Sequence, residues 1–211
     1  MEVVYTNERE YRSSKRDIIG LYKDILYLDD KLDIEGISYK DTYKVKRFLN
    51  GYKLRLNKRI KDIFNYLNLD LSILNKKIYE LPSTTYKYVM LAYLLLKNKR
   101  FIIFDYFDAG LTYKEQKKLI KIIKQLKEDG FQIIVVSNNI KFLSFCVDKI
   151  EIINEDGSLF YGDIKDLFNN IDYIKHVDII NFIYKANELG AKLSYTFDRN
   201  ELIKDIYRSL T

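Results

Sequence analysis

The sequence predicts an α/β protein built on a parallel sheet, and residues 97–162 carry most of that prediction. Two apolar runs, residues 101–104 and 131–136, are typical of buried strands. Residues 114–129, which lie between them, repeat their apolar side chains with a helical period and stop at Gly130. A strand, a helix and a second strand in this order form a βαβ unit, whose two strands run parallel.

Short strands followed by helices are predicted before this unit. Residues 3–5 and 25–28 are short apolar runs that favour strands, and residues 39–69 become helical in pattern. Four apolar side chains lie on one face of a helix in residues 59–67. They are Ile60, Ile63, Phe64 and Leu67.

A second helix is predicted to run to Leu96, with hydroxyl N-caps offered by Ser83, Thr84 and Thr85. It is apolar nearly all round, which predicts burial.

A hairpin and a helical tail complete the expected elements. Residues 149–153 form a third strand, a turn follows at residues 155–157, and residues 159–161 return as another strand. From residue 171 the pattern indicates helices separated by a loop around residues 190–196.

Composition indicates a globular chain without a disulfide or a thiolate metal cage. Hydrophobic residues make up 47% and charged residues 31% of the 211 residues. The one cysteine, Cys146, lies in an apolar run and is predicted to be a small buried residue. The one histidine, His176, has no second histidine or nearby cysteine and is interpreted as a surface or packing residue.

The net charge of +6 raises the question of nucleic-acid binding. Along the chain, however, the lysines are spread out and alternate with acids, and no short segment concentrates them with glycine or arginine. We interpret the charge mostly as a solvated surface and expect no nucleic-acid partner.

The sequence predicts a cytoplasmic protein, or one that is peripheral to the inner face of the cell membrane. Residues 1–8 lack the basic start and apolar run of a signal peptide. The best membrane candidate, residues 89–96, is cut off by Lys97 and is far too short to span a bilayer.

The residues that follow the predicted strands are the candidates for function, because ligands of open parallel sheets bind beyond the carboxyl ends of the strands. Asp105 and Tyr106 follow the first strand of the βαβ unit, and Ser137 and Asn138 follow the second. The layout suggests nucleotide chemistry, whereas the residue types argue against it.

The order of elements resembles the second half of an ABC-transporter nucleotide-binding domain. Residues 76–88 lie where that family has its signature motif and the following helix. Residues 101–111 lie where it has the Walker B strand, the catalytic glutamate and the D-loop. Residues 135–139 match the strand that ends in Ser-His-Asp, and residues 154–163 resemble the closing hairpin.

The tail resembles the C-terminal extension of energy-coupling factor (ECF) ATPases, the subunits that drive uptake of vitamins and metal ions. The similarity lies in residues 179–190 and 201–203. It implies a truncated P-loop NTPase-like (ABC ATPase) parallel sheet with a helical subdomain and a C-terminal helical extension. The implied parts are residues 1–38 as remnant strands after a missing P-loop, 39–97 as the helical subdomain, 98–170 as the α/β core and 171–211 as the extension.

A P-loop, Gly-x-x-x-x-Gly-Lys-Ser/Thr, is the first family motif that we cannot find. None of the eight glycines lies in such a run. Successive backbone N–H groups and a lysine must surround phosphate, so we expect no phosphate cradle. The chain is expected to begin after this motif, with residues 2–7 resembling the strand that follows it.

The resemblance implies vestigial Walker B and switch positions. Asp105 stands at the position of a magnesium ligand, but a lone strand-end aspartate lacks most of the ligands that magnesium needs, so no metal site is expected beyond it. Tyr106 replaces the glutamate that acts as general base, and a phenol with a pKa of about 10 is a poor acceptor of a water proton. Asn138 replaces the switch histidine and cannot carry charge.

The signature position is also altered, and side chains there would obstruct the close backbone approach that glycines permit. In place of Ser-Gly-Gly-Gln the chain has Pro82, Ser83, Thr84 and Thr85. Where the Q-loop glutamine is expected, it has Asp29 and Asp30.

The leading hypothesis is a non-catalytic, ABC-ATPase-like subunit. It would pair with an ABC-type ATPase subunit, a transporter membrane subunit, or both, and would need neither ATP nor magnesium as a cofactor. The implied contact surfaces are the helical insertion at residues 39–69 and the tail from residue 171.

Three alternatives stay open. A split ATPase would bind ATP and magnesium with a P-loop supplied by another polypeptide, although Tyr106 and Asn138 argue against it. A basic nucleic-acid module would use tyrosine and phenylalanine as stacking platforms. A decaying paralogue would keep the fold without a role.

Overall fold

The computed structural model describes residues 4–5, 25–28, 42–50, 57–97, 100–153 and 159–210. Four predictions fall partly or wholly outside these residues. They concern the N-terminal part at residues 1–38 with its strand at residues 2–7, the Asp29–Asp30 pair, parts of the helical segment 39–69, and the hairpin turn at residues 155–157.

The first sheet confirms the predicted βαβ unit. Strands β2 (Ile25–Leu28), β3 (Phe101–Asp105) and β4 (Gln132–Val136) lie in that order and pair in parallel. The crossover between β3 and β4 is helix α5 (Tyr113–Glu128), whose buried face packs onto β4. Thr112 and Glu115 form a capping box at its start, and Gly130, with φ of 81°, follows its end.

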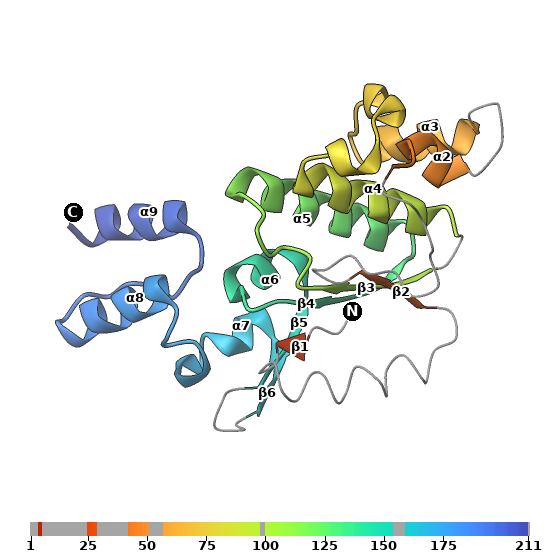
Figure 1. Cartoon of the computed structure of the whole chain (residues 1–211). Coiled ribbons are helices and arrows are strands. Elements are labelled where there is room, and N and C mark those ends of the chain that lie inside the picture. The colour runs from red at the N-terminus through yellow and green to blue at the C-terminus, as the bar shows by residue number, and fades with distance from the viewer. Residues whose placement is uncertain are drawn as a thin grey trace.

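The second sheet pairs a strand from the start of the chain with two strands that follow the βαβ unit. Strand β1 (Val4–Tyr5) pairs in parallel with β5 (Lys149–Ile153), and β5 pairs antiparallel with β6 (Leu159–Asp163), which confirms the predicted hairpin strands. In Figure 1 the second sheet lies below the first sheet, and helices α4 and α5 lie above the first sheet.

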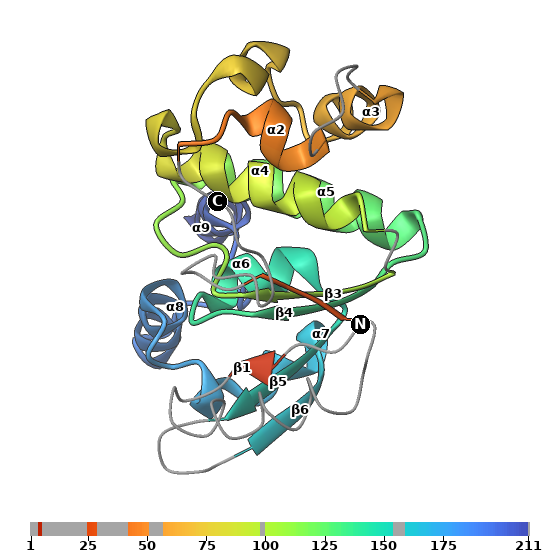
Figure 2. The same cartoon turned by 45° about the vertical axis from the view of Figure 1, so that its right-hand side comes forward.

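The helical part before β3 begins with α2 (Val45–Asn50) and α3 (Lys58–Tyr66). Two 3₁₀ turns, η1 (Leu71–Asn75) and η2 (Ile78–Glu80), lead into α4 (Ser83–Leu95). Helices α2 and α3 lie beyond α4 as seen from the sheet (Figures 1 and 2). As predicted, Ile60, Phe64 and Leu67 are fully buried on one face, and most of α4 is buried.

The predicted hydroxyl cap of α4 is wrong. Pro82 occupies the N-cap position with φ of −55°, and no side chain there accepts a capping hydrogen bond. Because proline already fixes a φ that suits a helix start, Ser83 and Thr84 fall inside the first turn. Thr84 instead bonds to the side chain of Glu115 on α5.

The chain after β4 continues with α6 (Ile140–Cys146), and after β6 with α7 (Ile164–Leu167) and the 3₁₀ turn η3 (Ile171–Tyr173). The tail consists of α8 (Asp178–Glu188) and α9 (Arg199–Leu210), which lie to one side of the sheets (Figure 1). The break between them confirms the predicted loop.

The tail is held by few buried side chains. Ile180 and Phe197 belong to the main core, where the Phe197 ring lies 5.2 Å from that of Phe168. Ile183, Leu193 and Leu202 form a separate small cluster.

Cys146 is buried and His176 is exposed, as predicted. In the part of the chain that the structure describes, no helix has the length and apolar character needed to cross a membrane.

Candidate functional site at the strand exits

The ends of β3 and β4 bring the predicted site residues to one edge of the first sheet. Asp105 pairs with Val136 across the two parallel strands, so the residues that follow each of them emerge side by side. We call residues 105–110 and 137–139 the strand-exit site. Ligands of parallel sheets bind at such an edge.

Asp105 is 5% exposed at the end of β3. The next residue, Tyr106, has φ of 49°, in the left-handed region that tyrosine rarely adopts. Its N–H donates to the carbonyl of Val136 at 2.9 Å, which holds the turn against the neighbouring strand. A non-glycine residue in this conformation costs on the order of 1–3 kcal/mol, so the surrounding contacts fix it.

A buried hydrogen-bond chain links the two strand exits. The Ser137 hydroxyl donates to Oδ2 of Asp108 at 2.8 Å and accepts from the N–H of Asn139 at 2.9 Å. Asp108 and Ser137 are 6% and 1% exposed. Burial raises the pKa of the Asp108 carboxyl, while the bond from Ser137 and the nearby charge of Lys87 act in the opposite direction.

Lys87 of α4 holds the loop that follows β3 in place. Its ammonium group donates to the carbonyls of Phe107 at 3.0 Å and Ala109 at 2.7 Å, and the side chain is 5% exposed. The Lys87 Nζ atom also lies 5.4 Å from the centre of the Phe107 ring. A buried positive charge is therefore in direct contact with the loop.

Lys87 is not among the site residues that were predicted from the sequence. The available signal was its helical phase, because Lys87 lies four and eight residues before Leu91 and Leu95, both of which are buried. A lysine in line with buried leucines has to find an acceptor inside the protein.

The other predicted site residues are less closely joined. Asn138 is exposed between the buried Ser137 and Asn139, and Asn139 caps α6 by accepting from the N–H of Phe142 at 3.0 Å. Pro82 and Ser83 are exposed at the start of α4. Lys87 lies on α4 about one helical turn after the residues at the signature position, and its bonds to the loop connect that helix to the strand-exit site.

Within the described ranges, this edge offers few groups that could hold magnesium or a nucleotide triphosphate, and the buried carboxylate of Asp105 is the main one. Among the described residues, no group of three histidine, cysteine or acidic side chains could hold a metal ion. Asp108 is engaged by Ser137, and the ammonium of Lys87 on the loop carbonyls would repel a second cation there. The 211 residues also contain no P-loop motif to surround phosphate.

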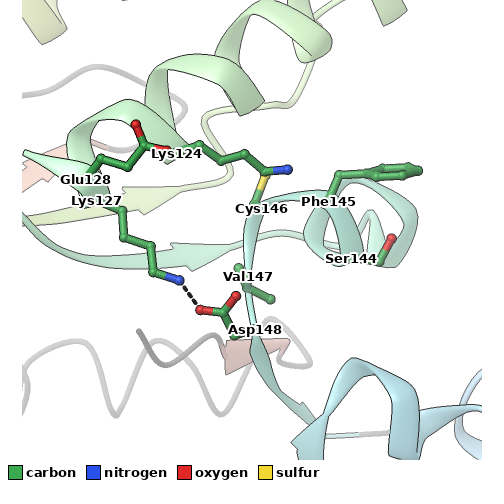
Figure 3. A pocket seen from close by; sticks show the side chains of 8 residues that line it. All are labelled: Lys124, Lys127, Glu128, Ser144, Phe145, Cys146, Val147 and Asp148. Atoms are coloured by element: carbon green, nitrogen blue, oxygen red, sulfur yellow. Dashed lines mark hydrogen bonds and ion pairs between the residues drawn. The ribbon is translucent and has the colours of Figure 1, made fainter.

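A separate cavity of about 610 Å³ opens at the far end of α6 from Asn139 (Figure 3). Lys127 and Asp148 form an ion pair across it, and Cys146 lines it together with Lys124. Burial raises the pKa of the Cys146 thiol, so this cysteine is a poor nucleophile. The cavity therefore holds no evident reactive group.

The relatives of the chain are ABC transporter ATP-binding proteins, although no protein-family model matches it. The ECF transporter ATP-binding protein of Methanococcus maripaludis is 21% identical over 152 residues, 68% of this chain. The corresponding protein of Mesomycoplasma hyopneumoniae is 26% identical over 121 residues, 57% of the chain. The ribose import ATP-binding protein of Caldanaerobacter subterraneus is 27% identical over 164 residues, 72% of the chain. The chain spans 54%, 44% and 33% of the lengths of these three relatives.

Solved structures agree in fold. The protein cbiO1 from Clostridium perfringens, part of the ABC transporter complex cbiONQ, matches with a TM-score of 0.61 at 17% identity, over 89% of this chain and 86% of that one. An ATP-binding cassette of an ABC transporter in its ADP conformation matches with a TM-score of 0.62 at 13% identity, over 87% of each chain. The chain is thus related in sequence to ABC transporter ATP-binding proteins, including ECF transporter proteins, and has the P-loop NTPase-like α/β fold of their ATP-binding domains.

Proposed function

We propose that the chain is a catalytically inactive, ABC-ATPase-like subunit that acts as a structural or regulatory partner in a transporter complex. The observation that carries this proposal is the strand-exit site, where three buried polar side chains already have partners within the chain. Lys87 binds the loop carbonyls, and Asp108 binds Ser137. Polar groups that are engaged in these bonds are not available to bind a nucleotide.

The residue types at two further positions of this site support the same proposal. Tyr106 and Asn138 stand where the resemblance implies a general base and a switch histidine, and neither side chain readily accepts a proton at neutral pH. Asp108 has a raised pKa, which suits a base, but its burial and its bond to Ser137 keep it away from a substrate water.

Partner binding is the role left to the surfaces. Four of the exposed large apolar side chains lie on or next to the tail helices. They are Phe182 (53% exposed), Leu189 (90%), Ile203 (50%) and Tyr207 (69%). We infer that the tail contacts an ABC-type ATPase subunit and that α2 and α3 contact a transporter membrane subunit, which would place the chain in the cytoplasm at the inner face of the membrane.

ATP binding and turnover by the purified chain test the proposal of inactivity. We expect no micromolar binding of a fluorescent ATP analogue with or without magnesium, and no phosphate release above a buffer control. The double variant Tyr106→Glu/Asn138→His should also fail to hydrolyse ATP, because it restores neither a phosphate cradle nor a metal site. Magnesium-dependent hydrolysis by the wild-type chain would contradict the proposal.

A reconstitution experiment separates a partner role from a split ATPase. The chain is added to a catalytic ABC ATPase subunit from the same cell, and both complex formation and turnover are measured. The proposal predicts a complex whose turnover does not change when Asp105 is replaced by Asn. If the Asp105→Asn variant abolishes turnover in the complex, the chain contributes a magnesium ligand and the split ATPase is correct.

A further inference from the structure

Helix α5 gathers lysines that are dispersed along the sequence. Lys114, Lys117, Lys121 and Lys124 are all exposed, and they follow one another at spacings of three and four residues. Such spacing places side chains in one row along a helix. With a rise of 1.5 Å per residue, the row is about 15 Å long. We call these four residues the basic ridge.

The ridge lies on the side of α5 that points away from the protein. The opposite side of the helix buries Leu119, Ile122, Ile123 and Leu126 in the main core. At 100° per residue, the mean direction of the ridge is opposite to that of the buried side chains. Lys114, Lys117 and Lys121 therefore form the outermost line of the helix, and Lys124 ends this line beside the cavity at α6.

Acidic side chains near the ridge neutralise only part of it, because Glu128 is the one acid in line with the four lysines and leaves three net positive charges along the row. None of its four lysines forms an ion pair within the described chain. The carboxylate of Glu115 is already held by the N–H and hydroxyl groups of Thr112, both at 2.7 Å, and by Thr84. Lys127, which does pair with Asp148, lies off the ridge toward α6.

One exposed aromatic ring extends the ridge at its start. Tyr113 is 64% exposed, and the Nζ atom of Lys117 lies 4.6 Å from the centre of its ring. A tyrosine with an apolar ring and a polar hydroxyl suits the boundary between water and lipid.

We propose that the basic ridge is a docking face for an anionic lipid surface. A straight row of outward charges can touch a plane along its whole length. The ridge contains lysine and no arginine, which suits diffuse attraction to many headgroups better than the geometric, bidentate recognition in which arginine excels. A nucleic-acid strand would call for several stacking rings, whereas Tyr113 is the one exposed ring described on α5 and Lys117 already lies over it.

The expected strength is that of an orienting contact. Each lysine close to an anionic membrane strengthens binding by roughly fivefold, so four of them together contribute a few hundredfold. This falls short of stable anchoring, which takes a second membrane signal or a membrane-bound partner. The attraction decreases as salt screens it.

Vesicle sedimentation with the full chain tests this inference. Phosphatidylcholine vesicles with and without phosphatidylglycerol are compared at low and at physiological ionic strength. The ridge variant carries Lys→Gln at positions 114, 117, 121 and 124. The control variant carries Lys→Gln at Lys76, Lys77, Lys149 and Lys165, which are also exposed and lie outside α5, α2, α3 and the tail. Both variants therefore lose the same charge.

We expect wild type and control to bind the anionic vesicles in a salt-dependent way, and the ridge variant to bind at least tenfold more weakly. Circular dichroism checks that each variant is folded, and the double variant Lys117→Gln/Lys121→Gln, expected to lose about half of the logarithmic effect, gives a milder comparison. Equal losses in the ridge and control variants would overturn the inference, because net charge would then suffice. Ridge-dependent binding to an oligonucleotide or an acidic peptide without binding to vesicles would overturn it as well.

Discussion

At the strand exits the polar side chains bond to one another inside the protein, whereas in the tail large apolar side chains face outward. Lys87, Asp108 and Ser137 are each less than 7% exposed and each has a protein partner. Phe182 and Leu189 in the tail are 53% and 90% exposed. These three polar side chains are satisfied without a ligand, while the tail keeps apolar surface that another molecule could cover.

This contrast separates the two ways in which an ATPase-like fold can be useful. A site that acts on nucleotide needs open, charged groups at the strand exits, and here a buried lysine and a serine engage the loop. A subunit that acts through contacts needs exposed apolar surface on a folded support. If the strand exits are closed and rigid, substitutions there should cost stability, whereas the tail surface should be dispensable for folding.

Replacing Lys87 with methionine should have the largest effect. The change leaves the carbonyls of Phe107 and Ala109 without their donor and removes the cation near Asp108. Each buried carbonyl left without a donor costs about 1–3 kcal/mol, so the loss should reach about 3 kcal/mol. Urea unfolding measures the loss of folding free energy.

Lys118→Met is the matched control for Lys87→Met. Lys118 is half-buried and donates to one carbonyl, that of Asn68, at 3.1 Å. Its removal should cost about 1 kcal/mol. If the two variants are equally stable, Lys87 does not hold the strand-exit loop.

Ser137→Ala should be the next largest change, at about 2 kcal/mol, because it leaves a buried carboxylate without its donor. Asp108 loses the 2.8 Å bond and the N–H of Asn139 loses its acceptor. Ser144→Ala, which removes one half-buried bond to the carbonyl of Lys141, is the control and should cost less than about 1 kcal/mol. Thermal and urea unfolding of both variants give the comparison.

The Asp108→Asn variant should change how stability depends on pH. Burial raises the pKa of Asp108 in the folded chain above its ordinary 3.8, so the folded chain holds this proton more tightly than the unfolded chain. The stabilising contribution of the protonated group is complete below the ordinary pKa and is lost as the pH rises through the folded pKa. Asparagine does not ionise and still offers Ser137 an oxygen, so the variant should gain stability relative to wild type as the pH rises above the ordinary pKa of 3.8. A difference in stability that does not change as the pH rises from 3.8 would show that the pKa of the Asp108 carboxyl is not raised.

The sheet and its crossover were predictable because each depends on a local period. The apolar runs of β3 and β4 and the helical stripe of α5 are visible in short windows, and the structure confirms all three. The start of α4 was not predicted correctly, because Pro82 takes the N-cap position in place of a hydroxyl residue. Local signals compete there, and the fixed φ of proline decides between them.

The candidate site was predictable only in part. Asp105 and Tyr106 follow from the strand pattern and the family resemblance, but the contact of Lys87 with Phe107 joins residues 20 positions apart. The positive φ of Tyr106 was also hidden, because tyrosine carries no preference for the left-handed region. Such features arise from tertiary packing, which a single sequence does not display.

Serine substitutions at Leu189 and Phe182 should have the smallest effect on folding, within about 0.5 kcal/mol, because both side chains are exposed. Lys185→Ser is the control, because Lys185 is a polar residue that is also exposed on the same helix. The double variant Phe182→Ser/Leu189→Ser should unfold at the same urea concentration as wild type and lose binding to a partner ATPase subunit, while Lys185→Ser should keep it. A loss of stability above about 1 kcal/mol would mean that these side chains pack within the chain, and the contrast with the strand exits would then fail.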